Sequence, residues 1–153
     1  MISSVSFFVP GIPRPGGSKT AAVIRRKGGE IVMHNGRPLT TTREAGKYTA
    51  TWRADVREAA RRAMDGASPF TGHLALRVSF FFPRPKQHFR ASGALKDNAP
   101  SFKGSRPDTT KLLRSLEDAL TGLVWMDDSQ IVCQVATKRY DSTPGARVCV
   151  QPA

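Results

Sequence analysis

The chain has 153 residues, of which 24 are Lys or Arg and 12 are Asp or Glu, so its formal net charge is +12. This length is typical of one compact domain around one hydrophobic core, and it excludes several independently folded domains. The composition, 39% hydrophobic and 24% charged, excludes a disordered chain. The apolar runs are far shorter than the roughly 20 residues of a membrane-spanning helix, so we expect no membrane partner.

The first residues, MISSVSFFVPG, contain no basic segment, and Pro10 and Gly11 interrupt their apolar run. This pattern does not match a secretory signal, so we expect a cytoplasmic protein. Cys133 and Cys149 are too few for a disulfide framework and are not spaced as zinc ligands. Both fall in predicted strands, which favours buried free thiols.

The positive charge is concentrated in the first two thirds of the chain. Residues 1–107 contain 19 Lys or Arg and 6 Asp or Glu (net +13), whereas residues 108–153 contain 5 and 6 (net −1). A basic surface of this size attracts polyanions, of which nucleic acid is the commonest in a cytoplasm. The alternative is that the charge serves only solubility.

The first predicted element is a strand over residues 4–9, where Val5, Phe7 and Val9 alternate with their neighbours before Pro10 ends the run. A loop rich in Pro, Gly and basic residues follows as far as Gly29. One interpretation of its end is a hairpin, in which residues 22–24 and 30–33 flank a basic turn at residues 25–29. Such a turn either lies along a phosphate backbone or is a solvated tip.

A helix is predicted from about residue 44 to residue 64, because Thr41 and Glu44 form a capping-box pattern and Gly66 follows its end. Apolar residues at spacings of three and four define its buried side: Tyr48, Trp52, Val56, Ala59 and Ala63. A second side carries an arginine stripe: Arg53, Arg57 and Arg61. This stripe either contacts DNA or is a solvated face.

Strict alternation predicts a long strand over residues 74–82 with one well-buried face. Residues 84–107 form a long basic connection, which we expect to become ordered on a substrate. A second helix is predicted from residue 108 or 109 to about residue 121, followed by strands at 130–137 and 147–151. We therefore predict one α/β (α+β) domain over residues 1–153, in which two main helices cover one mixed sheet.

Acidic residues gather in a short part of this basic chain. Five of the 12 lie within 21 positions: Asp108, Glu117, Asp118, Asp127 and Asp128. Carboxylates from the helix start and from the following strand are expected to converge at one sheet edge, where they would suit Mg²⁺ or Mn²⁺ and hence phosphodiester hydrolysis. The structural alternative is a helix cap at Asp108, an ion pair of Arg114 with Asp118 and an acidic surface turn.

The segment from Arg106 to Ile131, RPDTTKLLRSLEDALTGLVWMDDSQI, resembles the signature of the RusA family of Holliday junction resolvases from bacteria and phages. The opening FFVPGIPRP, the region from Lys47 to Trp52, the run FFFPRPK and the placement of Lys138 are also similar to family members. The resemblance implies a small α/β homodimer that uses Mg²⁺ to make paired symmetric nicks in four-way DNA junctions.

By position, the resemblance implies catalytic and metal-binding roles for Asp108 and Asp128, with Asp118 and Asp127 as further candidate ligands. It places the functional lysine of the family at Arg114, which keeps the charge. The second family aspartate falls on Thr110 and the family asparagine on Lys111. Either Asp118 or Asp127 then completes the metal site, or metal binding and catalysis are impaired.

We therefore predict a Mg²⁺-dependent crossover junction endodeoxyribonuclease that binds branched DNA as a homodimer during recombination and repair. The alternatives are a catalytically silent branched-DNA-binding protein of the same fold and a nuclease that acts on RNA or flaps. The residues expected to contact DNA are Lys111, Arg53, Arg57, Arg61, Lys86, Arg90, Lys103 and Arg106.

Overall fold

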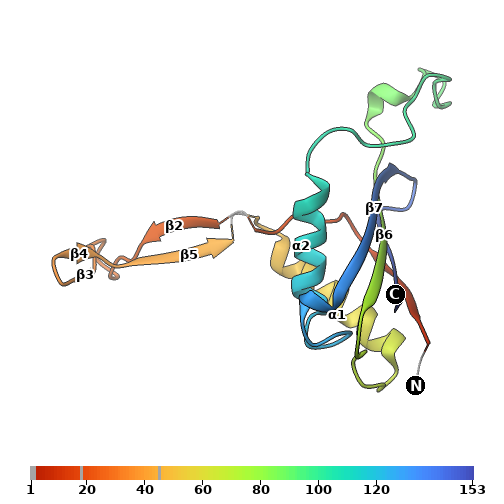
Figure 1. The fold of residues 1–153 in the computed structure, drawn as a ribbon. Coiled ribbons are helices and arrows are strands. Elements are labelled where there is room, and N and C mark those ends of the chain that lie inside the picture. Colours follow the sequence, from red (N-terminus) through yellow and green to blue (C-terminus); the bar gives the residue numbers. More distant parts are fainter. Residues whose placement is uncertain (1–2, 18, 45) are drawn as a thin grey trace.

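The computed structural model describes residues 3–17, 19–44 and 46–153. Its centre is a four-stranded mixed sheet with the strand order β1–β8–β6–β7 (Figure 1). β6 and β7 are parallel, and the other neighbouring pairs are antiparallel. The strands of this sheet are β1 (Val5–Pro10), β6 (Leu74–Phe82), β7 (Ile131–Tyr140) and β8 (Gly145–Pro152).

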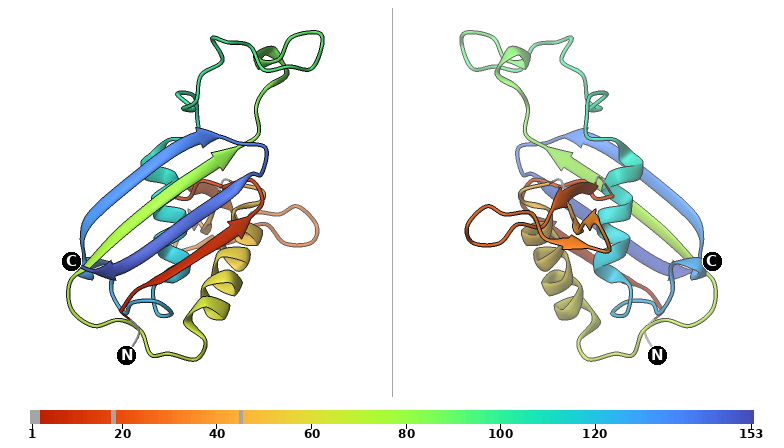
Figure 2. Two further views of the ribbon diagram at one scale, coloured as in Figure 1. Left: turned by 90° about the vertical axis from the view of Figure 1, so that its right-hand side faces the viewer. Right: turned by 90° about the vertical axis from the view of Figure 1, so that its left-hand side faces the viewer.

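Two α-helices, α1 (Thr49–Met64) and α2 (Thr109–Leu120), lie on the same face of the sheet. Figure 2 shows both helices on one side and the four strands uncovered on the other. Two 3-10 helices complete this part: η1 (Lys86–His88) and η2 (Asp128–Gln130). The predicted fold class, two helices against one mixed sheet, is confirmed. Neither α-helix of the described residues is long and apolar enough to span a bilayer.

The core lies between the helices and the central strands. β6 was predicted with the correct bounds, and its alternate residues from Leu74 to Phe82 are all buried. β6 has neighbours on both sides, so its inward side chains are shielded by β7 and β8 as well as by the helices. In α2, three leucines spaced four residues apart, Leu112, Leu116 and Leu120, are fully buried against this layer.

The predicted start of the first helix is wrong by five residues. Residues Thr40–Glu44 form β5, which pairs with β2 (Lys19–Val23), and the helix begins at Thr49 after Tyr48. A capping box satisfies only two backbone groups, whereas the β2–β5 ladder pairs five residues of each strand. The buried side shifts accordingly to include Ala60 and Met64, while Tyr48 is 49% exposed.

β2 and β5 form an arm that extends away from the body (Figure 1). At its end lie β3 (Met33–His34) and β4 (Arg37–Pro38). The hairpin predicted around the basic turn is present, since the amide of Arg26 donates to the carbonyl of Glu30 at 2.8 Å. Beyond this hairpin, pairing continues between β2 and β5, which was not predicted from the sequence.

Residues 84–107, a second projection, contain η1, turns and isolated β-bridges but no β-strand or α-helix, in agreement with the predicted long connection. Its base packs on the ends of β6 and β7. The His88 ring meets the edge of the Tyr140 ring at 4.9 Å, and the ammonium of Lys103 lies 5.4 Å from the centre of the Phe82 ring. Backbone hydrogen bonds from Lys103 to Lys138 and from Tyr140 to Ser101, both 3.0 Å, close this base.

Both cysteines are free, as predicted, but the expected burial is wrong for Cys133, which is exposed. β7 is an edge strand, and Cys133 points to the uncovered face of the sheet, where Cys149 on β8 is partly shielded. The alternation of the sequence identifies a strand but does not say whether a helix covers each face.

We expect Leu116→Ala to lower the free energy of unfolding by about 2–5 kcal/mol, because the side chain is fully buried between α2 and the sheet and its loss leaves a cavity. Urea denaturation followed by circular dichroism measures the change. The matched control is Val135→Ala on the uncovered face of β7, where the side chain is 46% exposed and a change below about 1 kcal/mol is expected. Equal losses in both variants would contradict this assignment of the core.

Candidate active site

The first acidic position of the candidate site is Asp108, immediately before α2. Its backbone occupies the N-cap position, but its side chain makes no capping hydrogen bond and is exposed. The residues that precede the helix are held by a side chain of β7. The ammonium of Lys138 donates to the carbonyls of Ser105 (2.9 Å) and Pro107 (2.8 Å). The carboxylate of Asp108 is therefore fixed in place by its backbone while it is left available for a ligand.

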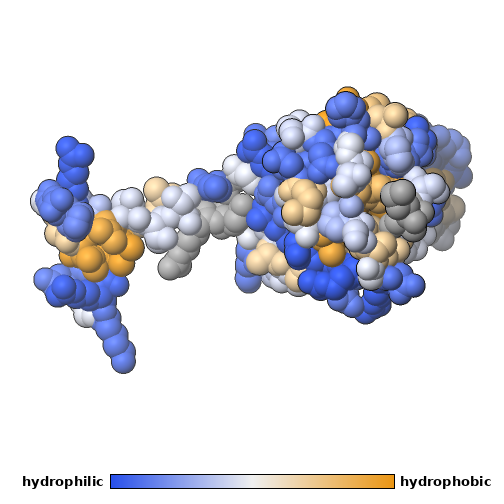
Figure 3. Space-filling model, turned by 60° about the horizontal axis from the view of Figure 1, so that its bottom comes forward, coloured by the Kyte–Doolittle hydropathy of each residue, from blue (hydrophilic) through white to orange (hydrophobic). Residues whose placement is uncertain are grey.

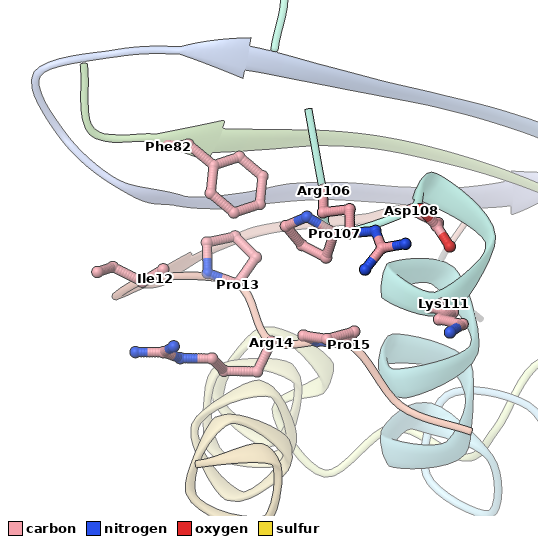
Figure 4. Close-up of a pocket in the computed structure, with 9 residues that line it drawn as sticks. All are labelled: Ile12, Pro13, Arg14, Pro15, Phe82, Arg106, Pro107, Asp108 and Lys111. Carbon is pink, nitrogen blue, oxygen red and sulfur yellow. The ribbon is translucent and has the colours of Figure 1, made fainter. Parts of the chain in front are cut away.

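Asp108 lies at the edge of a hollow of about 560 Å³ at the N-terminal end of α2 (Figure 4). The lining combines an apolar wall with one carboxylate and three cations: Ile12, Pro13, Arg14, Pro15, Phe82, Arg106, Pro107, Asp108 and Lys111. Figure 4 shows Arg106, Asp108 and Lys111 at one end, whereas the Arg14 side chain extends away from them. This surplus of positive charge suits an anion such as a phosphate group.

Arg14 was not among the site residues predicted from the sequence. It lies in the segment between β1 and β2, which crosses α2 where the amide of Gly16 donates to the carbonyl of Lys111 at 2.8 Å. A Cβ on Gly16 would come within 3.1 Å of the Cα of Ser115, so this close approach requires glycine. The Pro-Arg-Pro-Gly-Gly run was the available signal, because its prolines and glycines indicate a constrained backbone around the arginine.

The second acidic position is Asp128, beyond the C-terminal end of α2. One of its carboxylate oxygens accepts hydrogen bonds from the indole N–H of Trp125 (3.0 Å) and from the hydroxyl of Thr121. Trp125 is fully buried, so Asp128 is anchored to the core although its residue is exposed. A carboxylate held in this way is pre-positioned for a ligand.

Glu117 is an acidic residue whose charge interacts with that of Asp128. It lies one helical turn before Thr121, is partly buried, and accepts a hydrogen bond from the amide of Gln134 on β7. Burial, followed by the negative charges of Asp128 and Asp118, raises the pKa of the Glu117 carboxyl above its ordinary 4.5. Glu117 belongs to the acidic cluster of the sequence but was not among the predicted site residues, because the fold of the chain after α2 decides which acid lies near Asp128.

Asp127 has a structural role in the turn before β7. Its side chain accepts a hydrogen bond from the amide of Ser129 at 2.8 Å, and the Gln130 side chain accepts one from the amide of Asp127 at 3.0 Å. Together they form a capping box for η2. The hydrogen bonds from Ser129 lower the pKa of the Asp127 carboxyl. This arrangement matches the acidic-turn alternative, and it does not direct Asp127 toward the hollow at Asp108.

Asp118 and two of the predicted DNA-contacting arginines join the two helices. The guanidinium of Arg53 donates to the carboxylate of Asp118 at 2.6 Å, and that of Arg57 donates to the carbonyl of Ala119 at 2.8 Å. Arg61 forms an exposed ion pair with Glu58 at 3.6 Å. These three arginines have partners within the chain, so we do not include them in the proposed DNA-binding surface.

The basic residues expected in the long connection are distributed along it. Lys86 and Arg106 are exposed, and Arg106 lines the hollow. Arg90 forms an ion pair with Asp97 at 2.5 Å, and the ammonium of Lys103 lies over the Phe82 ring. The connection thus presents cations next to the Asp108 hollow and beyond it.

The two acidic positions lie at opposite ends of α2. The helix has twelve residues, which corresponds to about 18 Å at the usual rise of 1.5 Å per residue. α2 and β7 are joined by residues 121–130 and run in opposite directions, so Asp108 before the start of the helix lies far from Asp128, which follows its end. The expected convergence of Asp108 and Asp128 at one sheet edge therefore does not occur within one chain.

Carboxylates are the ligand type that Mg²⁺ prefers, so the residue types fit this ion. The number of carboxylates gathered at any one place does not fit a Mg²⁺ site. Among the residues that the structure describes, no group of three or more His, Cys, Asp or Glu side chains could hold a metal ion. A single chain thus supplies two parts of a candidate metal site, at Asp108 and at Asp128 with Glu117, rather than one complete site.

The structure thus combines a mixed sheet and two helices with an uncapped carboxylate at a basic hollow and a second, anchored carboxylate. The sequence model described as endodeoxyribonuclease RusA matches residues 19–151. The chain belongs to the RusA endodeoxyribonuclease family, as the resemblance predicted.

A curated relative is the Bacillus subtilis (strain 168) protein YqaN, whose description, "uncharacterized protein", states no activity. It is 29% identical over 86 residues, which cover 53% of this chain and 58% of the relative. The match thus spans little more than half of either protein.

We expect Glu117→Gln to raise the melting temperature at pH 8, because it removes a partly buried charge that Asp128 and Asp118 repel. The rise should be only on the order of 1–2 °C, since Glu117 is partly exposed and solvent screens this repulsion. The pKa of Glu117 is raised in the folded protein, so its charge opposes folding when the pH lies above this pKa. At pH 4, below the ordinary value of 4.5, Glu117 is largely protonated in both states and the gain should disappear.

Thermal unfolding followed by circular dichroism at both pH values measures this difference. The control is Glu58→Gln on α1, where the carboxylate accepts a hydrogen bond from Arg62 at 2.9 Å and its removal should give no gain. A stabilisation by Glu117→Gln that is equal at pH 4 and pH 8 would show that the charge of Glu117 is not the cause.

Proposed function

We propose that this protein is a divalent-metal-dependent, structure-selective endodeoxyribonuclease that cuts Holliday junctions and other branched DNA during recombination and repair. The observation that supports this most directly is Asp108, an uncapped carboxylate at the edge of a basic hollow, whose preceding residue Pro107 is held through its carbonyl by Lys138. Membership of the RusA endodeoxyribonuclease family supports the reaction class.

The residues of the hollow have complementary roles in this proposal. Arg14, Arg106 and Lys111 attract a DNA phosphate and hold it beside the carboxylate of Asp108. Arg114, exposed on α2, stabilises the negative charge that develops on the phosphate in the transition state. Asp108 and Asp128 would hold Mg²⁺ or Mn²⁺, an ion that polarises a phosphoryl oxygen and lowers the pKa of a bound water.

The separation of Asp108 from Asp128 favours a homodimer. In a two-fold symmetric pair each contact occurs twice, so Asp108 of one chain can lie beside Asp128 of its partner at two equivalent places. Met126 and Val132, which flank the Asp128 turn, are 65% and 56% exposed and offer apolar surface for such a contact. Two equivalent sites would also account for paired symmetric nicks.

DNA outside the cut site would lie along the connection at residues 84–107. Its exposed cation Lys86, with Lys103 at its base, is suited to backbone phosphates, whereas Arg90 pairs with Asp97 and is left out for the same reason as the arginines of α1. Contacts of this kind release counterions, so the affinity for DNA should fall steeply as the salt concentration rises.

Thr110 favours a second candidate function, a catalytically silent protein that binds branched DNA. It stands exposed in the first turn of α2, two residues from Asp108, where the family resemblance implies a second carboxylate. A hydroxyl is a weaker neutral ligand for Mg²⁺ than a carboxylate. The two candidates differ in cleavage and not in binding, so one assay separates them.

We expect the protein to nick a labelled four-way junction in the presence of Mg²⁺ or Mn²⁺, but not with a chelator. A linear duplex of the same sequence should stay intact. Asp108→Asn, which keeps the shape but removes the charge, should slow cleavage by about 10²-fold or more. Asp141→Asn, in the exposed β7–β8 turn, is the matched control and should cleave normally. Binding of the junction without nicks in either metal would establish the silent candidate.

Mixing two inactive variants tests whether each site takes carboxylates from two chains. Equal amounts of Asp108→Asn and Asp128→Asn, unfolded and refolded together, should recover about a quarter of the wild-type nicking, because half of the dimers are mixed and each mixed dimer has one intact site. Each variant alone should be inactive. If both carboxylates acted within one chain, no mixed dimer would contain an intact site and the mixture would stay inactive.

A further inference from the structure

The arm formed by β2 and β5 ends in a hydrogen-bonded knob, residues 24–39, that the cleavage site does not use. Three short segments of this knob lie side by side. The amide of Ile24 donates to the carbonyl of Leu39 (2.8 Å), that of Val32 to Ile24 (2.9 Å) and that of Leu39 to Val32 (2.8 Å). These bonds hold the knob in one shape although it lies far from the core.

Two turns carry positive charge on the knob. The first is closed by the hydrogen bond from the amide of Gly29 to the carbonyl of Arg26 at 2.9 Å, and the second contains Asn35 and Gly36, both with positive φ. The charged residues of the knob are Arg25, Arg26, Lys27 and Arg37, with Glu30 as the only acid. Lys27 and Arg37 form no ion pair with the described residues.

A hydrophobic patch lies between these charged projections. Ile31, Met33 and Leu39 are 38%, 55% and 38% exposed. Figure 3 shows this patch at the end of the arm, with hydrophilic side chains extending on both sides of it. Apolar side chains at this distance from the core contribute nothing to its packing, so the patch indicates a surface that binds another molecule.

The chemistry of the knob matches a groove of duplex DNA. A groove presents base edges and sugars between two rows of phosphates, which is the arrangement that an apolar strip between cations complements. Two-stranded β-ribbons are among the elements that enter DNA grooves. The net charge of the knob, four basic residues against one acidic residue, opposes a basic protein surface such as a second copy of this chain.

The arm places this surface away from the cut site. The five residues of β2, Lys19–Val23, span about 16 Å in an extended strand, and the knob lies beyond them. The arm and the basic connection at residues 84–107 leave the body in different directions (Figure 1). One straight duplex does not follow both directions, whereas two duplex arms that meet at a branch can.

We propose that the knob at residues 24–39 is a second DNA-binding site, which enters a groove of a duplex arm other than the one held at the Asp108 hollow. The inference rests on the proposed function, because it assumes that branched DNA is the substrate. It assigns to this arm the preference for branched over linear DNA, with Lys27 and Arg37 on the phosphates and Met33 on the sugars and base edges.

The test is the double variant Lys27→Gln/Arg37→Gln, measured as binding of a four-way junction and of a linear duplex with a chelator present. Loss of two phosphate contacts should reduce the slope of log K against log salt by about 1.8 and weaken junction binding by about tenfold or more near 0.1 M salt. Binding of the linear duplex should change by less than about twofold, within the range of a surface charge change.

A matched control removes the same charge elsewhere. Arg61→Gln/Arg62→Gln lies on α1, where both side chains pair with Glu58, and it should leave the junction slope unchanged. Met33→Ser should weaken junction binding without changing the slope, because it removes an apolar contact and no phosphate contact. An unchanged junction slope in the Lys27/Arg37 variant, or equal losses for junction and linear duplex, would overturn the proposal.

Two further readouts separate this proposal from its alternatives. Sedimentation of Met33→Ser should give the wild-type mass, and a smaller mass would show that the patch binds protein instead. Junction cleavage by wild-type protein is measured in parallel with metal present. If the wild type cleaves the junction and the arm variant binds it equally well, only the second site fails; if the wild type binds neither DNA, the proposed function fails with it.

Discussion

The packing of α2 on the centre of the sheet is the constraint on which the rest of the molecule depends. Leu112, Leu116 and Leu120 are fully buried there, and their burial fixes both the rotation of the helix and its position along the strands. Each end of α2 then carries an acidic position: Asp108 before its first turn and Asp128 against the Thr121 hydroxyl beyond its last. The distance between the two carboxylates is therefore set by the length of a helix and not by flexible loops.

The same packing divides the acidic residues into two groups. Asp118 is bound to Arg53 of α1, and Asp127 caps the turn before β7, so both stabilise the frame. Asp108 and Asp128 are held in place by groups other than a cation, namely the helix backbone and the Trp125 indole. Arg53 neutralises Asp118 and the turn engages the Asp127 side chain, whereas the Asp108 carboxylate makes no capping hydrogen bond, which is why we assign Asp108 and Asp128 to the proposed site.

In our proposals, basic residues from three parts of the fold contact DNA. The hollow at Asp108 supplies cations close to a reacting phosphate, the connection at residues 84–107 extends this surface, and the arm carries further cations to a distance. The connection is anchored to β7 by backbone hydrogen bonds and an aromatic contact at its base, the arm is held together by the β2–β5 ladder, and the described residues of neither projection belong to the core. A branched substrate, with duplexes that diverge from one point, is the ligand that fits surfaces arranged in this way.

The sequence by itself determined most of the fold, because hydrophobic periodicity is a local property. The bounds of β6 and α2 were predicted closely since their buried residues recur at spacings of two and of three to four. The motif from Arg106 to Ile131 was also sufficient to identify the family. Long-range pairing decided the rest: β2 captured residues 40–44 as a strand, although the local capping pattern favoured a helix.

The candidate site was only partly predictable for the same reason. Motif position identified Asp108 and Asp128, but the arrangement of α2 against β7 placed them at opposite ends of a helix. Contacts between α1 and α2 engaged Arg53 and Asp118, and the crossing of the Gly16 segment brought Arg14 to the hollow. Which charges are neutralised within the chain and which remain for a ligand depends on neighbours distant in sequence, and only the tertiary structure supplies those neighbours.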